Sequence, residues 1–302
     1  EDRAEAATAA ARALINQDGL HALIGPQLSR HAIPVSVVAE DAGIPMISPM
    51  ASNPTVTAGK RWVFRLAASD DAQGRALART AAEDLGARRA AILFDIANPY
   101  SRGLADLFRT SFTEAGGQVV AVETYTTDQS ISFEPQMRKI RDARPDVLLL
   151  PNSTSAVTIQ LRTARALGVR AMFLGSDTWD TRIIGAVPEA ESAYVTHQWN
   201  PSIPSSAGRA FVDAYVRRYG ETPKATAALT YDAFQLLWAA VRRAEGLDLE
   251  RLREGIAGTE RHDGASGIVG FRGSGEPVRS VFVSRLDDGG LRLHRVVEPA
   301  PR

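Results

Sequence analysis

The chain has 302 residues, of which 44% are hydrophobic and 23% charged, and its 35 basic and 35 acidic residues leave no formal net charge. This length suits two lobes better than one core. The charge balance argues against a broad nucleic-acid or membrane-surface footprint, because both need a basic face. No cysteine is present, which excludes disulfides, thiolate zinc sites and cysteine nucleophiles.

The first part of the chain alternates helix and strand. Residues 3–17 are alanine-rich and helical in character. Ser29 begins a predicted helix that runs to about Ala42. Short apolar runs predict strands at 21–24, 44–48 and 62–65.

A second alternating series follows Asp70. Its predicted helices are 71–86, 100–115, 133–143 and 154–167, and its predicted strands are 89–94, 118–125, 146–150 and 171–174. The strands are continuous apolar runs, which is typical of strands covered by helices on both faces. Alternating β and α units predict parallel sheets with right-handed crossovers.

The pattern changes after Ser205. Two long helices are predicted at 205–219 and 225–245, and a shorter one at 248–257. The last part, 267–297, predicts three strands separated by glycine turns. No apolar run approaches the ~20 residues that span a bilayer, so we expect no membrane insertion in this segment. The chain opens without the basic start and apolar stretch of a signal peptide, so an export signal would lie upstream.

Patterns of known catalytic or metal sites are missing. The sequence contains no phosphate loop, no G-x-S-x-G and no H-E-x-x-H. The five histidines are scattered, and none has metal-ligand spacing (His21, His31, His197, His262 and His294). We therefore expect no enzyme activity, no catalytic residues, no metal and no cofactor.

Small hydroxyl residues follow two of the first strands. In doubly wound sheets, ligands bind beyond the carboxyl ends of the strands, and Ser29 and Ser52 lie in two such loops. Free backbone N–H groups at helix starts suit an anion. Two hydroxyls and such amides would hold a carboxylate without a cation. The alternative, equally weighted, is that both serines only cap helices.

Two further strand ends carry groups that suit a ligand. Asp177 and Trp179 follow the strand at 171–174, where the acid would receive an ammonium group and the indole would cover a side chain or face a cation. The alternative is an N-cap aspartate beside a core tryptophan. Tyr100 stands at a helix start after the strand at 89–94.

At these strand ends the sequence resembles the periplasmic binding proteins of type I fold, the leucine/isoleucine/valine-binding receptor family. Each matching motif alone is weak, but the set runs through the whole chain in the right order. The matching segments are 24–29, 43–52, 64–65, 70–74, 100–103, 145–146, 173–177, 231–233 and 270–271.

The resemblance assigns ligand contacts in the loops that follow the first strands. In that family the positions matching Ser29, Met50 (through its backbone) and Ser52 bind the α-carboxylate and amino end of the ligand, with Ala51 in the same loop. The family residue at Ser52 is often threonine, so the hydroxyl is kept. Retention of both hydroxyls and of the acid at Asp177 favours an amino acid over a urea, an amide or an aromatic acid.

The resemblance also assigns contacts in the second series. It implies that Tyr100 closes over the ligand and that Asp177 takes the ammonium group, with Trp179 beside it. A family tyrosine falls near Ser153, so an aromatic group is lost there and the side-chain specificity stays open.

The implied architecture is α/β, with two Rossmann-like doubly wound lobes joined by three crossings. Lobe one would hold 1–68 and 199–280, lobe two 69–198 and 281–302, with the ligand cleft between them. Family members begin with a strand, a helix and a second strand that this chain lacks. We expect a fragment, a misplaced start or another element in that place.

The resemblance implies an extracytoplasmic, monomeric solute-binding protein that captures an amino acid by hinge closure. Its partner would be the permease of an ABC importer, and it would bind no nucleic acid. Three alternatives stay open: the ligand-sensing domain of a signalling receptor or regulator, a binder of urea, amides or aromatic acids, and an enzyme with a doubly wound sheet.

Overall fold

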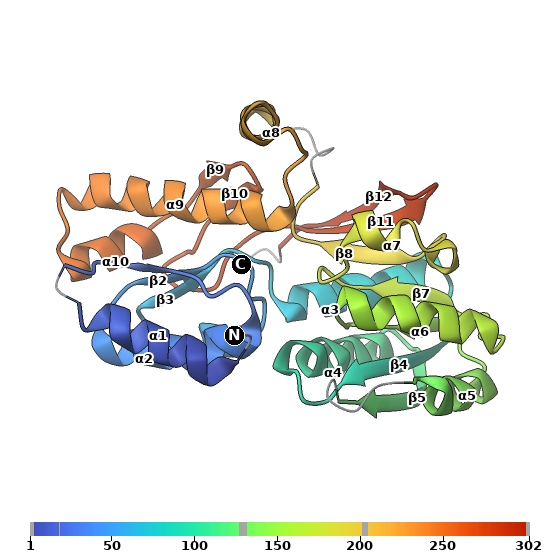
Figure 1. Cartoon of the computed structure of the whole chain (residues 1–302). Coiled ribbons are helices and arrows are strands. Elements are labelled where there is room, and N and C mark those ends of the chain that lie inside the picture. The colour runs from blue at the N-terminus through green and yellow to red at the C-terminus, as the bar shows by residue number, and fades with distance from the viewer. Residues whose placement is uncertain (1–2, 18, 127–131, 201–204, 300–302) are drawn as a thin grey trace. The chain divides into compact units, whose positions relative to one another are not determined.

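The computed structural model describes residues 3–17, 19–126, 132–200 and 205–299 (Figure 1). The chain divides into two compact units. Unit 1 comprises Glu1–Ser69 and Gln198–Ser280, and unit 2 comprises Asp70–His197 and Val281–Arg302. The chain therefore passes from one unit to the other three times.

Unit 1 is built on a small parallel sheet in the order β1-β2-β3. Its strands are β1 (Leu23–Ile24), β2 (Met46–Ser48) and β3 (Val63–Arg65). The helices α1 (Ala4–Ile15) and α2 (Ser29–Ala42) cover one face, and α9 (Ala225–Ala244) and α10 (Leu249–Ala257) cover the other (Figure 1). The remaining elements are the short helix η1 (Pro54–Val56), the helix α8 (Ser206–Tyr219) and the hairpin of β9 (His262–Gly264) and β10 (Gly267–Val269).

Alternating side chains explain why helices cover both faces of this sheet. Successive strand residues point to opposite faces. Met46 and Val63 pack into the cluster formed with α1 and α2. Their neighbours Ile47 and Phe64 pack into the cluster formed with α9 and α10. Both faces are apolar, so the strands read as continuous apolar runs.

Unit 2 is built on a seven-stranded sheet in the order β12-β11-β8-β7-β6-β4-β5. The strands β4 to β8 are parallel, and β11 and β12 add an antiparallel edge. Their bounds are β4 (Arg89–Asp95), β5 (Gln118–Tyr125), β6 (Val147–Leu149), β7 (Met172–Gly175), β8 (Tyr194–His197), β11 (Val281–Asp287) and β12 (Gly290–Val297).

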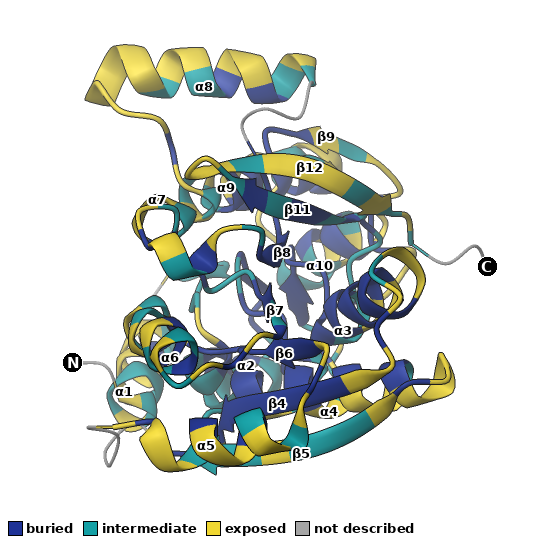
Figure 2. Ribbon diagram, turned by 90° about the vertical axis from the view of Figure 1, so that its right-hand side faces the viewer, coloured by how far each residue is buried: buried dark blue, intermediate teal, exposed yellow. Residues whose placement is uncertain are grey.

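Helices cover both faces of this sheet. One face packs against α5 (Glu134–Ala143), α6 (Thr154–Ala166) and α7 (Thr181–Ile184), and the other against α3 (Asp70–Arg79) and α4 (Pro99–Glu114) (Figure 2). A π-helical turn, η2 (Thr80–Asp84), extends α3, and the short helix η4 (Pro188–Ala190) precedes β8. The inner strands β6 and β8 are buried throughout, whereas the edge strand β12 is largely exposed.

The predicted α/β class and almost every predicted element are confirmed. The sequence analysis missed β8, β9 and α7, which are short and lack a clear apolar run. The parallel pairing expected of the alternating series is confirmed for β4 to β8, and β11 adds a strand antiparallel to β8. No helix in the described part of the chain is long and apolar enough to cross a membrane.

Candidate functional site

Three loops in unit 2 leave the carboxyl ends of neighbouring parallel strands. Tyr100 is the second residue of α4, after β4. Ser153 precedes α6, after β6, and is exposed. Asp177 follows β7. Because β4, β6 and β7 are adjacent and parallel, these loops lie along one edge of the sheet, where doubly wound folds bind ligands.

The carboxylate of Asp177 accepts hydrogen bonds on both oxygens. The Tyr100 hydroxyl donates to Oδ1 at 2.6 Å, and Nε2 of Gln73 donates to Oδ2 at 3.1 Å. The amide oxygen of Gln73 in turn accepts from the Thr196 hydroxyl at 2.8 Å. Two residues predicted from separate motifs, Tyr100 and Asp177, are thus in direct contact.

The protonation state of Tyr100 follows from its surroundings. Tyr100 is only 7% exposed. Burial, followed by the negative charges of Asp177 and Asp70, raises the pKa of Tyr100 well above its ordinary value. The phenol is therefore neutral at physiological pH and acts as a hydrogen-bond donor to the carboxylate.

Trp179 lies in the core of unit 2 and is 4% exposed. Its indole Nε1 donates to the Leu150 carbonyl at 3.0 Å. The ring lies against Gly175, where a Cβ would come within 2.6 Å of it. This placement favours the core interpretation over contact with a ligand. The helix cap in this segment is Asp180, which caps α7, and not Asp177.

In unit 1, Ser29 does not cap a helix. The N-cap of α2 is Leu28, and Ser29 is the first helical residue. Ser29 is 4% exposed, and its hydroxyl accepts from the backbone N–H of Asn53 at 3.3 Å. Asn53 caps η1, because its side chain accepts from the backbone N–H of Thr55. Ser29 therefore connects the start of α2 to the loop that contains Ser52.

The loop after β2 holds the other predicted residues of unit 1. Met50 is half-buried and packs against the cluster formed with α9 and α10. Ala51 and Ser52 are each 1% exposed. Like Ser29, which follows β1, they lie beyond the carboxyl end of a parallel strand.

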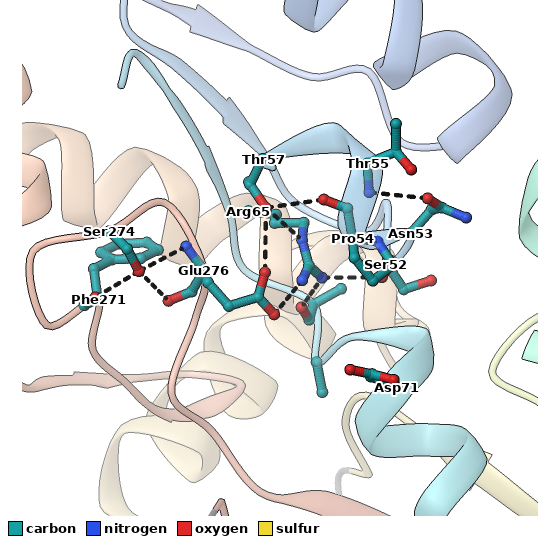
Figure 3. Close-up of polar contacts among 12 residues, drawn as sticks. Ser52, Asn53, Pro54, Thr55, Thr57, Arg65, Asp71, Phe271, Ser274 and Glu276 are labelled. Carbon is teal, nitrogen blue, oxygen red and sulfur yellow. Dashed lines mark hydrogen bonds and ion pairs between the residues drawn. The ribbon is translucent and has the colours of Figure 1, made fainter. Parts of the chain in front are cut away.

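A buried arginine holds this loop in place (Figure 3). Nη1 of Arg65 donates to the carbonyl oxygens of Ser52 at 3.1 Å and Ala67 at 3.0 Å. Nη2 pairs with the Glu276 carboxylate, which also accepts from the Thr57 hydroxyl at 3.2 Å. The Arg65 side chain is fully buried, whereas that of Glu276 is 46% exposed. The positive charge is therefore satisfied within unit 1.

Sequence reasoning did not assign Arg65, Gln73 or Glu276 to the site. Arg65 had a signal, because it is a charged residue that ends a short buried strand. Gln73 lies in the segment 70–74 that resembles the family, but a glutamine on a helix does not by itself indicate contact with an acid. Glu276 had no signal, since it lies 211 positions from its partner.

The two clusters differ in the ligand charge that they suit. The loop around Ser52 presents hydroxyl and backbone groups, which suit an anion. The carboxylate of Asp177 accepts hydrogen bonds from the neutral side chains of Tyr100 and Gln73, and a carboxylate suits a cation. Within the ranges that the structure describes, no three histidine, aspartate or glutamate side chains gather as a metal site.

Comparisons of sequence give a family match. Residues 2–290 match the profile of the family described as "Periplasmic binding protein". An "Amino acid binding protein" of Pseudomonas aeruginosa is 28% identical over 253 residues, covering 82% of this chain and 67% of the relative. A "Leucine-specific-binding protein" of Salmonella typhimurium is 27% identical, and a "Leu/Ile/Val-binding protein" of Citrobacter freundii is 28% identical. Both matches cover 79% of this chain, and they cover 64% and 65% of those proteins. The chain thus spans about two thirds of the length of its curated relatives.

Solved structures agree with this match. The structure is similar to a leucine binding protein, LivK, of Thermotoga maritima, with 31% identity, a TM-score of 0.93, and coverage of 99% of this chain and 85% of that one. It is also similar to the branched-chain amino acid transporter substrate binding protein LivJ of Streptococcus pneumoniae in complex with isoleucine, with 25% identity, a TM-score of 0.88 and the same coverages.

Proposed function

Because this chain belongs to the periplasmic binding protein family, we propose that it is an extracytoplasmic solute-binding protein. Its ligand is an amino acid, which it delivers to the permease of an ABC importer. It binds the ligand and releases it unchanged, without catalysis. The relatives reported above are named for binding, which supports this role over an enzymatic one.

The observation that carries the proposal is the state of Asp177. Its carboxylate is held by Tyr100 and Gln73, which are neutral donors. An α-ammonium group would form an ion pair with this carboxylate. A charge-assisted hydrogen bond of this kind contributes about 1.5–3 kcal/mol.

In unit 1, the proposed contacts of the α-carboxylate are the hydroxyls of Ser29 and Ser52 and the backbone of the loop from Met50 to Ser52. Ser29 and Ser52 are nearly fully buried, so a hydrogen bond from either is little weakened by water. Arg65 does not take this role, because its charge is paired with Glu276 and two carbonyl oxygens.

We propose that units 1 and 2 are the two lobes and that both contact the same ligand. Binding then stabilises a closed arrangement through hinge motion at the three connections. Micromolar affinity corresponds to about −8 kcal/mol, which a few charge-assisted bonds supply after ordering costs.

The ligand class that we propose is a branched aliphatic amino acid, with L-leucine as the first candidate. The names of the Thermotoga and Streptococcus proteins support this choice. The exposed Ser153 adds no charge to the loop after β6, which is consistent with an apolar ligand side chain.

A thermal-shift screen of the purified protein tests the proposal. The panel holds the twenty amino acids, urea, short amides and benzoates, because a ligand that binds only the native state raises the melting temperature by mass action. We expect the largest rise with leucine, isoleucine or valine, confirmed by calorimetric titration.

The other outcomes contradict parts of the proposal. A rise with urea or benzoates alone keeps the binding role and overturns the ligand class. No rise with any compound, in a sample that melts cooperatively, overturns the binding role for this chain.

A further inference from the structure

Gln73 connects the candidate ligand acid to a strand at the boundary of unit 2. It lies on α3, is the fourth residue of unit 2, and is fully buried. Its side chain contacts two groups: Nε2 donates to Asp177 Oδ2 at 3.1 Å, and Oε1 accepts from the Thr196 hydroxyl at 2.8 Å. Thr196 is also fully buried and lies on β8.

The hydrogen bonds determine which way the amide of Gln73 faces. A carboxylate accepts and does not donate, so the NH₂ group must face Asp177. The amide oxygen then faces Thr196, whose hydroxyl is able to donate. A flipped amide would place its oxygen against a negative charge, so Thr196 and Asp177 select one orientation.

The carboxylate of Asp177 is thereby fixed by donors on both oxygens. Tyr100 holds Oδ1 at 2.6 Å, and Gln73 holds Oδ2. Rotation about the Cβ–Cγ bond would break at least one of these bonds. The donors Tyr100 and Gln73 are both neutral side chains.

The backbone beneath Gln73 is rigid as well. The next residue, Gly74, lies against α4, where an added Cβ would come within 3.0 Å of the Phe108 backbone nitrogen. Thr196 is held in the sheet by pairing of β8 with β11, opposite Val283. Neither end of the bridge moves without disturbing the core, and such rigid support is what a binding residue needs.

We infer that Gln73 is a positioning residue for ammonium recognition, which rests on the proposed amino-acid function. It orients the Asp177 carboxylate in advance, so that the protein prefers a ligand with an α-ammonium group over the same ligand without it. The competing interpretation is that Gln73 only satisfies buried polar groups and contributes to stability alone.

The test compares Gln73→Met with the wild type. Methionine keeps the length of the side chain and removes both hydrogen bonds. The probes are L-leucine and 4-methylpentanoate, which has the same carbon skeleton and carboxylate without the ammonium group. Calorimetric titration gives Kd for each probe, and the readout is the ratio of the two Kd values.

We expect Gln73→Met to lower the preference for leucine over 4-methylpentanoate about tenfold, as loss of one hydrogen bond to a charged group predicts. A purely structural role weakens both probes alike and leaves the ratio unchanged, which would overturn the inference. The matched control is Gln160→Met, because Gln160 is also fully buried in unit 2 and bonds Asn152 instead. We expect it to keep the ratio of the wild type.

A second readout needs no ligand. The Tyr100 hydroxyl proton, bonded to Asp177, should give a slowly exchanging proton resonance that Tyr100→Phe removes. We expect it to exchange faster in Gln73→Met, because the carboxylate that holds it is no longer fixed by a second donor, and at the wild-type rate in Gln160→Met. Failure of the wild type to bind leucine counts against the proposed function. Unchanged hydroxyl exchange in Gln73→Met counts against the role of Gln73.

Discussion

The loop after β2 in unit 1 and the loop after β7 in unit 2 are held in place by opposite chemistry. In unit 1 a fully buried cation, Arg65, binds two carbonyl oxygens and a partly exposed carboxylate. In unit 2 the anion itself, Asp177, is the candidate contact, and neutral groups hold it. The arginine of unit 1 is paired within its unit, whereas the acid of unit 2 is the proposed contact of the ligand.

The two loops lie at equivalent places in their sheets, but their charged residues have different roles. A paired arginine makes a loop rigid without adding net charge to its surroundings, so the loop presents hydroxyl and N–H groups. A carboxylate held by amide and phenol donors on its two oxygens is fixed in one orientation. Stability should therefore depend most on the arginine in unit 1, and binding on the carboxylate in unit 2.

The largest effect is expected from Arg65→Met. The substitution leaves the carbonyl oxygens of Ser52 and Ala67 buried without their donor, at about 1–3 kcal/mol for each such group. We expect the free energy of unfolding to fall by about 3 kcal/mol in total, measured by urea denaturation. The control is Arg61→Met, whose side chain is 66% exposed and whose loss should change stability by less than about 0.5 kcal/mol. Equal effects for the two variants would contradict the role of Arg65.

Asp177→Ala should have its main effect on binding. Removing the carboxylate deletes the proposed contact of the ammonium group, so affinity for leucine should fall by about 2 kcal/mol, or about 30-fold. Calorimetric titration measures it, and circular dichroism checks the fold. Asp180→Ala is the control, because this nearby acid caps α7 and should leave Kd unchanged. Retained affinity in Asp177→Ala would refute the assignment.

Tyr100→Phe tests the neutral phenol through the fall of the free energy of unfolding at alkaline pH. The folded protein raises the pKa of Tyr100 through burial and the charges of Asp177 and Asp70, so above pH ~10 only the unfolded chain loses this proton. Wild-type stability should therefore lose an extra ~1.4 kcal/mol per pH unit above that point. Urea denaturation between pH ~9 and ~11 should show a shallower loss for Tyr100→Phe. The exposed Tyr219, changed to Phe, serves as control, and a slope in Tyr100→Phe equal to that of the wild type would contradict the prediction.

The smallest effects are expected from Ser29→Ala and Ser52→Ala. Each removes one neutral hydroxyl, so affinity for leucine should fall by about 1 kcal/mol, or about fivefold, while the order of preference among aliphatic amino acids stays the same. Ser36→Ala is the control, because Ser36 is buried on the same helix as Ser29 and donates to the Ile33 carbonyl. It should alter stability and not affinity. A changed order of preference would argue against carboxylate contacts.

Much of the fold could be predicted because its signals are local. Apolar runs such as Val147–Leu149 mark strands covered on both faces, and helix starts such as that at Pro99 follow from capping residues and proline. The strand ends then place Ser29, Ser52, Tyr100 and Asp177 by a topological rule. That rule does not predict which groups these residues contact.

The sequence by itself determined the α/β class, the order of helices and strands, and the loops that carry the candidate ligand contacts, since each depends on side chains close together in the chain. Only the tertiary structure decided that Trp179 is a core residue, that β11 pairs antiparallel with β8, and which partners hold the site. Gln73 and Asp177 are 104 positions apart, and Arg65 and Glu276 are 211 apart. Local preferences carry no information on such partners, because only the packing of helices onto sheets brings them together.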